Sequence, residues 1–561
     1  MGGVTLERDV ACRVRDGTVL RADVYRPVAQ GTQPVLLMRT PYGKEEAQTG
    51  SGYGHPAALA RRGYLVVVQD CRGRHNSEGA FVPFEHEADD GYDTVEWAAG
   101  LQGADGRVAM YGFSYPGATQ LLAAIRRPPG LVAIAPGFTS SSYHDGWTYE
   151  GGALSLAFVA GWAAGLAWDT ARDAAHTETM ADLARVVTDP SWLAALPVSA
   201  LPHLVPERAP YYHDWLDHPS EDEYWRATAI REDYGRIDVP GLHLAGWYDV
   251  FLAGSVENFV ELDRRIGRQK LVIGPWTHGP WVPTPGSGGG RDAAAPAVND
   301  WLLRWLDFVL RGSDTGVLDA PVTAFVLGGG WRDLDGWPPS GSRPLDFYLH
   351  SQGHANSRFG DGSLSTQPPG DEPADVFVYD PLAPSSSAGG HSCCYEPIVP
   401  VGPASQLGRE SWGEVLVYST EPFENETDVI GDVEVTLYAA SSAQDTDFTA
   451  RLCLVDSDGE SINLTEGIVR ARYRESLAAP SLIEPGRVYE YRIRLRSVGV
   501  VVPAGHCLRL DVSSSDFPHW DRNLNTGGPL YQESADRAAV ATQIVLHDRT
   551  YPSRISLPVV S

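Results

Sequence analysis

A single serine stands on a tight turn between two recognisable elements. Ser114 lies in the hexapeptide 112–117 (GFSYPG), with a predicted strand before it (107–111) and a predicted helix after it (117–125). A strand, turn and helix in this order expose the serine hydroxyl, and the helix N-terminus favours negative charge beside it. The hexapeptide has proline where the usual G-x-S-x-G motif has its second glycine. The motif therefore indicates acyl-transfer chemistry but needs partners elsewhere in the chain.

Two residues later in the chain supply those partners. A serine hydroxyl needs an imidazole to take its proton, and the imidazole needs a carboxylate that fixes its tautomer and stabilises its charged form. Asp249 follows the predicted strand 239–246, and His278 follows the predicted strand 270–274. The order serine, aspartate, histidine is that of the α/β-hydrolases. We therefore expect Ser114, Asp249 and His278 to meet at one edge of a sheet.

Asp70 is the alternative to Asp249, since it also ends a predicted strand (64–69). It precedes the serine, however, which is the wrong order for this arrangement. Its neighbours Arg72 and Arg74 favour a structural ion pair instead.

The spacing of apolar residues along the 561-residue chain changes at three points, and these points divide the chain into segments of different predicted secondary structure. Near-continuous apolar strands alternate with helices at 1–140 and again at 239–318, which predicts a parallel sheet covered on both faces. Residues 141–238 are rich in alanine, tryptophan and leucine at helical spacing, with a helix expected from Gly151 to Ala167. Short alternating strands with Gly, Pro, Asp and Ser turns fill 319–561. We predict an α/β fold with an inserted helical cap and a C-terminal all-β jelly roll.

The amino-acid composition and charge restrict the classes of binding partner and the kinds of site that we expect. The formal net charge of −28 disfavours nucleic acid and anionic membranes. The N-terminal residues have no basic and apolar leader pattern, and no run is long enough for a membrane span, so we expect a cytoplasmic protein. The six cysteines show no zinc-site spacing, and the adjacent Cys393 and Cys394 favour two small apolar residues in a loop over a redox pair. A homodimer is one alternative for the oligomeric state, which the sequence leaves open.

Several motifs in the same order as in one known family carry a resemblance over essentially the whole chain. The sequence resembles the cocaine esterase branch of the CocE/NonD hydrolases, which are related to the X-Pro dipeptidyl peptidases and consist of an α/β-hydrolase domain, a helical cap and a jelly roll. The motifs that carry the resemblance are RTPYGK (39–44), QDCRGR (69–74), DGYDTVEW (90–97), GFSYPG (112–117), GWYD (246–249), GPWTH (274–278), TDFTAR (446–451), GIVRARYRE (467–475), SSSDFP (513–518) and NLNTG (523–527).

The resemblance implies a role for each matching residue. Ser114 is the nucleophile, His278 the general base and then acid, and Asp249 its orienting carboxylate. The hydroxyl of Tyr42 and the backbone amide of Tyr115 form the oxyanion hole, which stabilises charge that develops only in the transition state. No metal or organic cofactor is implied.

The resemblance also implies an acyl pocket formed by Trp147, Trp162 and Phe251. We therefore expect a small-molecule ester with a hydrophobic, aromatic or branched acyl group as substrate. The loop 391–396 departs from the apolar segment that the family has there, so the sequence does not predict cocaine as a substrate.

Three alternatives stay open beside this serine carboxylic-ester hydrolase. An α-amino acid ester hydrolase or acyltransferase would need carboxylates for the substrate ammonium, to which Glu150 and Asp145 could contribute. An X-Pro dipeptidyl peptidase usually has an additional N-terminal helical domain, which this sequence does not show. A carbohydrate-binding or scaffolding protein with a vestigial site would not need Ser114, Asp249 and His278 together with Tyr42.

Overall fold

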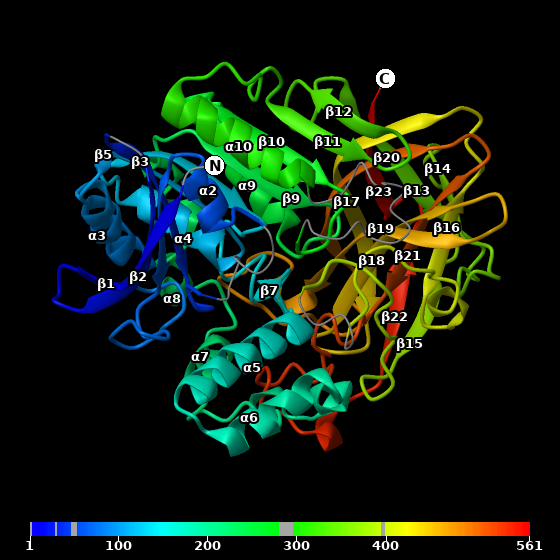
Figure 1. The fold of residues 1–561 in the computed structure, drawn as a ribbon. Coiled ribbons are helices and arrows are strands. Elements are labelled where there is room, and N and C mark those ends of the chain that lie inside the picture. Colours follow the sequence, from blue (N-terminus) through cyan, green and yellow to red (C-terminus); the bar gives the residue numbers. More distant parts are fainter. Residues whose placement is uncertain (1–2, 29–30, 46–52, 280–295, 394–398, 561) are drawn as a thin grey trace.

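Two large sheets form the two halves of the molecule, and a group of helices lies across their junction (Figure 1). The computed structural model describes residues 3–560 except 29–30, 46–52, 280–295 and 394–398. The N-terminal half holds a ten-stranded sheet and the C-terminal half an eleven-stranded sheet. No helix among these residues is long and apolar enough to cross a bilayer.

The ten-stranded sheet has the order β1-β2-β4-β3-β5-β6-β9-β10-β11-β12. Its centre, from β4 to β11, is parallel, and antiparallel strands close both edges. The central strands are almost entirely buried, as expected when both faces are covered. The strands are β1 (Val4–Arg13), β2 (Val19–Pro27), β3 (Gln33–Thr40), β4 (Leu65–Asp70), β5 (Ala104–Phe113), β6 (Leu131–Gly137), β9 (Gly241–Gly246), β10 (Gln269–Gly274), β11 (Val322–Val326) and β12 (Gly330–Leu334).

Helices cover both faces of this sheet because successive strand side chains point to opposite sides. Leu37 and Met110 pack against helices α3 and α4, whereas Leu36 and Ala109 pack on the other face against α2 and α10. The covering helices are α2 (Pro56–Arg61), α3 (Glu87–Ala99), α4 (Tyr115–Ile125), α9 (Leu252–Ile266) and α10 (Pro296–Arg311).

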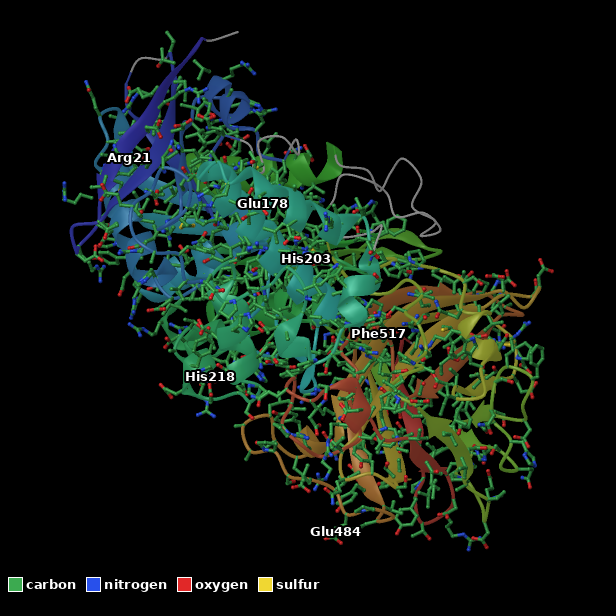
Figure 2. All side chains as sticks on the ribbon, turned by 90° about the horizontal axis from the view of Figure 1, so that it is seen from below. Arg21, Glu178, His203, His218, Glu484 and Phe517 are labelled. Carbon is green, nitrogen blue, oxygen red and sulfur yellow. The ribbon has the colours of Figure 1, made fainter. Side chains whose placement is uncertain are left out.

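The cap lies between β6 and β9 in the sequence and across the junction of the two halves in space. Figure 2, seen from below, shows its labelled residues Glu178 and His203 in front of the α/β half, with Phe517 at the border with the C-terminal half. Phe517 packs against the apolar cluster that the cap shares with the ten-stranded sheet. The cap contains β7 (Tyr149–Glu150), β8 (Ala153–Leu154), α5 (Leu156–Asp173), α6 (Thr177–Leu183), η1 (Ala184–Val187), η2 (Pro190–Ala194), η3 (Val198–Ala200), α7 (Pro210–Asp217), α8 (Glu223–Arg226), η4 (Ile230–Glu232) and η5 (Tyr234–Arg236).

The expected start of the first cap helix is wrong. Helix α5 begins at Leu156, not at Gly151, because Gly151 and Gly152 have φ values of +53° and +86° and form the turn between β7 and β8. Left-handed backbone of this kind suits glycine and ends a helix pattern. A Cβ atom at Gly151 would lie 2.1 Å from the carbonyl oxygen of Ile468, so the turn docks directly on the C-terminal sheet.

The C-terminal half is all-β, and its strands bury one face in a separate core. In β15 the alternation is strict, with Val376 and Val378 exposed between buried neighbours. The strands are β13 (Ser342–His350), β14 (Ser363–Ser365), β15 (Asp375–Tyr379), β16 (Leu416–Thr420), β17 (Thr427–Ser441), β18 (Asp447–Val455), β19 (Ser461–Arg470), β20 (Tyr489–Val502), β21 (Cys507–Ser513), β22 (Ala541–Leu546) and β23 (Arg554–Val560), with short 3-10 helices η7 (Arg409–Ser411), η8 (Ala471–Tyr473) and η9 (Ala535–Arg537).

Candidate active site

Ser114 stands on a strained turn between β5 and α4. Its backbone has φ +65° and ψ −130°, a conformation that non-glycine residues rarely adopt and that marks functional sites. The Ser114 amide donates to the carbonyl oxygen of Gly137 on the neighbouring strand, at 2.9 Å, which fixes the turn to the sheet edge. Helix α4 begins at Tyr115, whose amide belongs to the first turn and so has no acceptor within the helix. That amide is therefore available to an anion beside Ser114.

Gly117 explains why the second glycine of the hexapeptide comes one position late. A Cβ atom at Gly117 would lie 2.8 Å from the carbonyl oxygen of Gly137 and 2.9 Å from Cβ of Thr139. Helix α4 thus packs too closely on β6 for any side chain at this position. Pro116 sits in the first turn of α4, where the missing amide hydrogen costs no hydrogen bond.

Asp249 and His278 meet because β9 and β10 are neighbouring parallel strands in matched register. Gly246 pairs with Gly274 at their carboxyl ends, and the two functional residues follow at the same edge. His278 Nδ1 lies 2.8 Å from Asp249 Oδ1. The side chains are 6% and 0% exposed, so this hydrogen bond is screened from water. The ring of His278 is also 6.1 Å from that of Phe113, the residue before Ser114.

Tyr42 follows β3 and brings a hydroxyl to the same edge. This hydroxyl accepts a hydrogen bond from Trp162 Nε1 at 3.2 Å. Burial raises the pKa of Tyr42 to about 12, although the side chain of Ser114 is close enough to lower it, so the phenol keeps its proton at neutral pH. A neutral hydroxyl beside Ser114 can donate to an oxygen that becomes negative.

Asp70 does not join the site and forms a structural ion pair as expected, but its partner is Lys44 and not Arg72 or Arg74. It accepts from the backbone amide of Lys44 at 2.7 Å and from Lys44 Nζ at 2.8 Å. Arg72 instead pairs with Asp90. Asp70 thus anchors the segment that carries Tyr42.

Arg74 holds the Tyr42 segment from the other side. Its Nε donates to the carbonyl oxygen of Pro41 at 2.8 Å, and its guanidinium also donates to Thr170 Oγ1 of α5 at 2.9 Å. The segment that carries Tyr42 is therefore held by two buried charged residues, Asp70 and Arg74, and Arg74 also connects it to the cap. Sequence reasoning missed both anchors because their partners lie at distant positions of the chain.

Aromatic rings adjoin the histidine. Phe251 lies 5.1 Å from the ring of His278 and stacks on Trp147 at 4.3 Å, and Trp147 packs edge-on against Trp162 at 5.3 Å. The structure thus brings the three expected acyl-pocket residues together. It adds members that sequence reasoning did not single out, namely Phe84, Tyr143, Phe158 and Trp215.

The side chain of Tyr115 forms hydrogen bonds as well as packing contacts. Its hydroxyl donates to Glu87 Oε1 at 2.9 Å and accepts from the Phe84 amide at 2.8 Å. Glu87 in turn pairs with buried Arg39, 2.6 Å away. The first residue of α4 is therefore anchored through its side chain.

Family models match both halves of the chain. Residues 16–280 match the X-Pro dipeptidyl-peptidase (S15 family) model, and residues 315–556 match the X-Pro dipeptidyl-peptidase C-terminal non-catalytic domain. A structure of a CocE/NonD family hydrolase from Staphylococcus aureus covers 100% of this chain and 94% of its own, with a TM-score of 0.73 and 18% identity. The cocaine esterase of Rhodococcus sp. is 38% identical over 572 residues, covering 100% of this chain and 99% of its own. At 38% identity over its full length, the chain belongs to the family of this cocaine esterase, the CocE/NonD serine hydrolases.

The predicted fold class is confirmed by these matches: an α/β-hydrolase part followed by a mostly β C-terminal part. An α-amino acid ester hydrolase structure also shares this fold, with a TM-score of 0.80, 23% identity and coverage of 99% of this chain and 96% of its own. At that identity the likeness establishes the fold alone. What distinguishes members of this fold must come from the residues around the site.

In this CocE/NonD hydrolase, the two carboxylates considered for a substrate ammonium already have protein partners. Glu150 Oε2 lies 2.5 Å from a guanidinium nitrogen of Arg496 and accepts from Trp520 Nε1 at 3.3 Å. Asp145 accepts from the Gly151 amide at 3.2 Å. Glu150 therefore ties the cap to the C-terminal half, whereas Asp145 is bonded within the cap.

Cys393 belongs to the apolar cluster that contains the aromatic rings and is 3% exposed. It is disulfide-bonded, so it is not simply the small apolar residue that the sequence predicted. Cys394 lies outside the described residues. Cys12, Cys71, Cys453 and Cys507 are free thiols.

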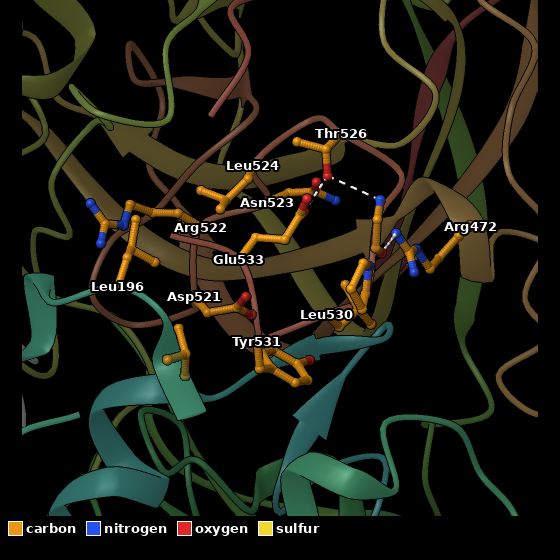
Figure 3. Close-up of a pocket in the computed structure, with 13 residues that line it drawn as sticks. Leu196, Arg472, Asp521, Arg522, Asn523, Leu524, Thr526, Leu530, Tyr531 and Glu533 are labelled. Atoms are coloured by element: carbon orange, nitrogen blue, oxygen red, sulfur yellow. Dashed lines mark hydrogen bonds between the residues drawn. The ribbon is translucent and has the colours of Figure 1, made fainter. Parts of the chain in front are cut away.

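Two other features lie away from the triad. Among the described residues, only Glu410, Cys453 and Asp511 place three metal-binding side chains close together, and Glu410 already pairs with Arg509. Figure 3 shows a pocket between the cap and the C-terminal half, with about 30 Å³ of free volume, room for one or two water molecules. Its polar lining is internally bonded: Thr526 donates to Glu533, and Arg472 donates to Gly528.

Proposed function

We propose that this chain is a serine carboxylic-ester hydrolase in which Ser114 is the nucleophile, His278 the general base and acid, and Asp249 the orienting carboxylate. The observation that carries the proposal is the buried 2.8 Å hydrogen bond between His278 Nδ1 and Asp249 Oδ1, beside the turn that holds Ser114 at φ +65°. The named relative at 38% identity is an esterase, which favours ester substrates.

In the first half-reaction, Ser114 Oγ attacks the ester carbonyl carbon while His278 Nε2 takes the hydroxyl proton. The carbonyl oxygen becomes an oxyanion that accepts from the hydroxyl of Tyr42 and the amide of Tyr115. His278 then gives its proton to the leaving alkoxide oxygen as the carbon–oxygen bond breaks. The alcohol leaves, and the acyl group remains on Ser114.

In the second half-reaction, His278 takes a proton from water, and the resulting hydroxide attacks the acyl carbon. The same oxyanion donors stabilise the second tetrahedral intermediate. Collapse returns the proton to Ser114 Oγ and releases the carboxylic acid. Asp249 accepts the hydrogen bond from His278 Nδ1 and stabilises the charged imidazole in both half-reactions.

The acyl preference follows from the rings next to His278. Because the rings of Phe251, Trp147 and Trp162 contact one another there, by stacking and edge-on packing, the acyl group that best fits beside them is hydrophobic and aromatic or branched. Chromogenic phenyl esters that differ only in the acyl part test this preference. Benzoyl esters should be turned over with higher kcat/KM than acetyl esters, and an equal or better acetyl ester would overturn the acyl assignment.

The same panel separates the related activities. An X-Pro dipeptidyl peptidase would release the anilide from Ala-Pro-anilide, and an α-amino acid ester hydrolase would prefer an acyl group with a free α-ammonium. Because Glu150 is paired with Arg496, we expect no gain from an α-ammonium group. An added amine acceptor that diverts the acyl group from water would assign acyl transfer instead of hydrolysis. A protein with a vestigial site would turn over none of these compounds.

A further inference from the structure

The loop that carries Asp249 is held by the C-terminal half as well as by its own sheet. Trp247 Nε1 donates to the carbonyl oxygen of Phe325 at 2.5 Å. A Cβ atom at Gly499 of β20 would lie 2.6 Å from the Trp247 ring, so this strand passes directly against the loop. Ser392, also in the C-terminal half, forms a parallel β-bridge with Asp249 itself.

The Ser392 segment is held in turn by one buried carboxylate. Glu466 Oε1 accepts from the backbone amide of His391 at 2.6 Å and from His391 Nδ1 at 2.7 Å. Gly390 has φ +102°, and a Cβ atom there would lie 2.6 Å from the same oxygen. The segment therefore wraps closely around the Glu466 carboxylate. The ring of His391 also lies 6.1 Å from that of Tyr248, the residue before Asp249.

Cross-strand pairing keeps Glu466 charged. Glu466 on β19 is directly opposite Arg451 on β18. Burial alone would raise the pKa of Glu466, but His391 and Arg451 hold it well below its usual range. Arg451 also donates to the carbonyl oxygen of Ala388 at 2.7 Å and to Asp516 at 2.7 Å. These two neighbouring residues of β18 and β19 thus hold the segment 388–391 at both ends, Arg451 at Ala388 and Glu466 at His391.

We propose that Glu466 is a positioning residue for the catalytic carboxylate, acting through His391 and the bridge between Ser392 and Asp249. This inference rests on the proposed role of Asp249. A carboxylate that stabilises a transient imidazolium must be aligned with it, and small displacements of such groups cost large factors in rate. The C-terminal half, whose family model is described as non-catalytic, would then be required for the rate of the chemical step.

The first test is Glu466→Gln, which keeps the size of the side chain and removes its charge. We expect kcat on a phenyl benzoate ester to fall about 10- to 100-fold, with KM within about twofold. The matched control is Asp375→Asn, another buried carboxylate of the same half, which accepts from Ser351 at 2.7 Å and lies near His547 at 2.8 Å. The control should lower the thermal midpoint but leave kcat unchanged. Equal kcat losses in both variants would overturn the proposal.

A double-mutant cycle separates this inference from the proposed function. Because Glu466 acts through Asp249, adding Glu466→Gln to Asp249→Asn should reduce the remaining kcat by less than about twofold. Losses that multiply would overturn the positioning role. If Asp249→Asn leaves kcat unchanged, the triad assignment itself fails, whereas a large loss in Asp249→Asn with none in Glu466→Gln removes only the positioning role.

A second pair of variants covers the case in which Glu466→Gln does not fold. His391→Asn can still donate from Nδ2 to Glu466, but His391→Leu cannot. We expect kcat within about threefold of the parent for His391→Asn and a loss of about 10-fold or more for His391→Leu, at similar KM. Equal kcat values for the two variants would contradict the proposal.

Discussion

The cap and the C-terminal half adjoin the proposed triad on two sides, and they contact it in different ways. On the cap side, the rings of Trp147 and Phe251 reach His278 through stacked and edge-on contacts. On the C-terminal side, Glu466 and Ser392 reach Asp249 through hydrogen bonds and a backbone bridge. Apolar contacts tolerate substitutions of similar volume, whereas a buried charged network does not tolerate the loss of one partner.

The difference assigns separate kinetic parameters to the two sides. Changes on the cap side should alter substrate binding and so KM, whereas changes on the C-terminal side should alter the alignment of the triad and so kcat. Tyr42 is the exception, because its hydroxyl lies among the aromatic rings yet is positioned by a hydrogen bond from Trp162.

The largest effect is expected from Asp249→Asn. Loss of the carboxylate allows the wrong imidazole tautomer and removes the stabilisation of its charged form, so kcat on a phenyl ester should fall roughly 10⁴-fold with little change in KM. Steady-state kinetics measure both parameters. A loss below about tenfold would mean that another carboxylate serves His278.

Tyr42→Phe should come next, because it removes one oxyanion donor and nothing else that touches the ester. We expect kcat to fall roughly 100- to 1000-fold. The loss should be the same for acetyl and benzoyl esters, since the oxyanion is common to both. A loss confined to benzoyl esters would place Tyr42 in the acyl pocket instead.

Phe251→Leu tests the cap side with a smaller change. One aromatic pairing contributes about 1 kcal/mol, so KM for a benzoyl ester should rise roughly fivefold. The kcat value should stay within about threefold, and an acetyl ester should be unaffected. A fall in kcat at unchanged KM would contradict the separation of the two sides.

The smallest effect concerns the stability of the C-terminal half, through the buried carboxyl group of Asp511 on β21. Burial raises the pKa of Asp511 from 3.8 to about 7, and neither of its oxygens has a hydrogen-bond partner among the described residues. The folded chain therefore keeps this proton after the unfolded chain has released it, so stability is lost as the pH rises from about 4 through 7.

Asp511→Asn stays neutral at every pH. Its melting temperature should match that of the parent near pH 4 and exceed it at pH 8, by roughly 2 °C or more. Thermal melts followed by circular dichroism at several pH values measure the difference. An advantage that does not grow with pH would contradict the assignment.

The parts that the sequence predicted depend on rules of local order. Strand ends and chain order placed Asp249 and His278 together, because the carboxyl ends of neighbouring parallel strands share one edge. The predicted start of helix α5 was wrong because an alanine-rich run resembles a helix even where Gly151 and Gly152 form a turn. The pairings of Asp70 with Lys44 and of Glu466 with His391 depend on which distant segments pack together, and no periodicity in the sequence encodes that.

Covalent labelling tests the central assignment most directly. A fluorescent organophosphonate that phosphonylates the active serine is added to the parent chain and to Ser114→Ala, and the labelled peptide is identified by mass spectrometry. We predict one adduct, on Ser114, in step with loss of esterase activity, and no adduct in Ser114→Ala with an unchanged circular dichroism spectrum. An adduct on another serine, or continued labelling of Ser114→Ala, would contradict the assignment.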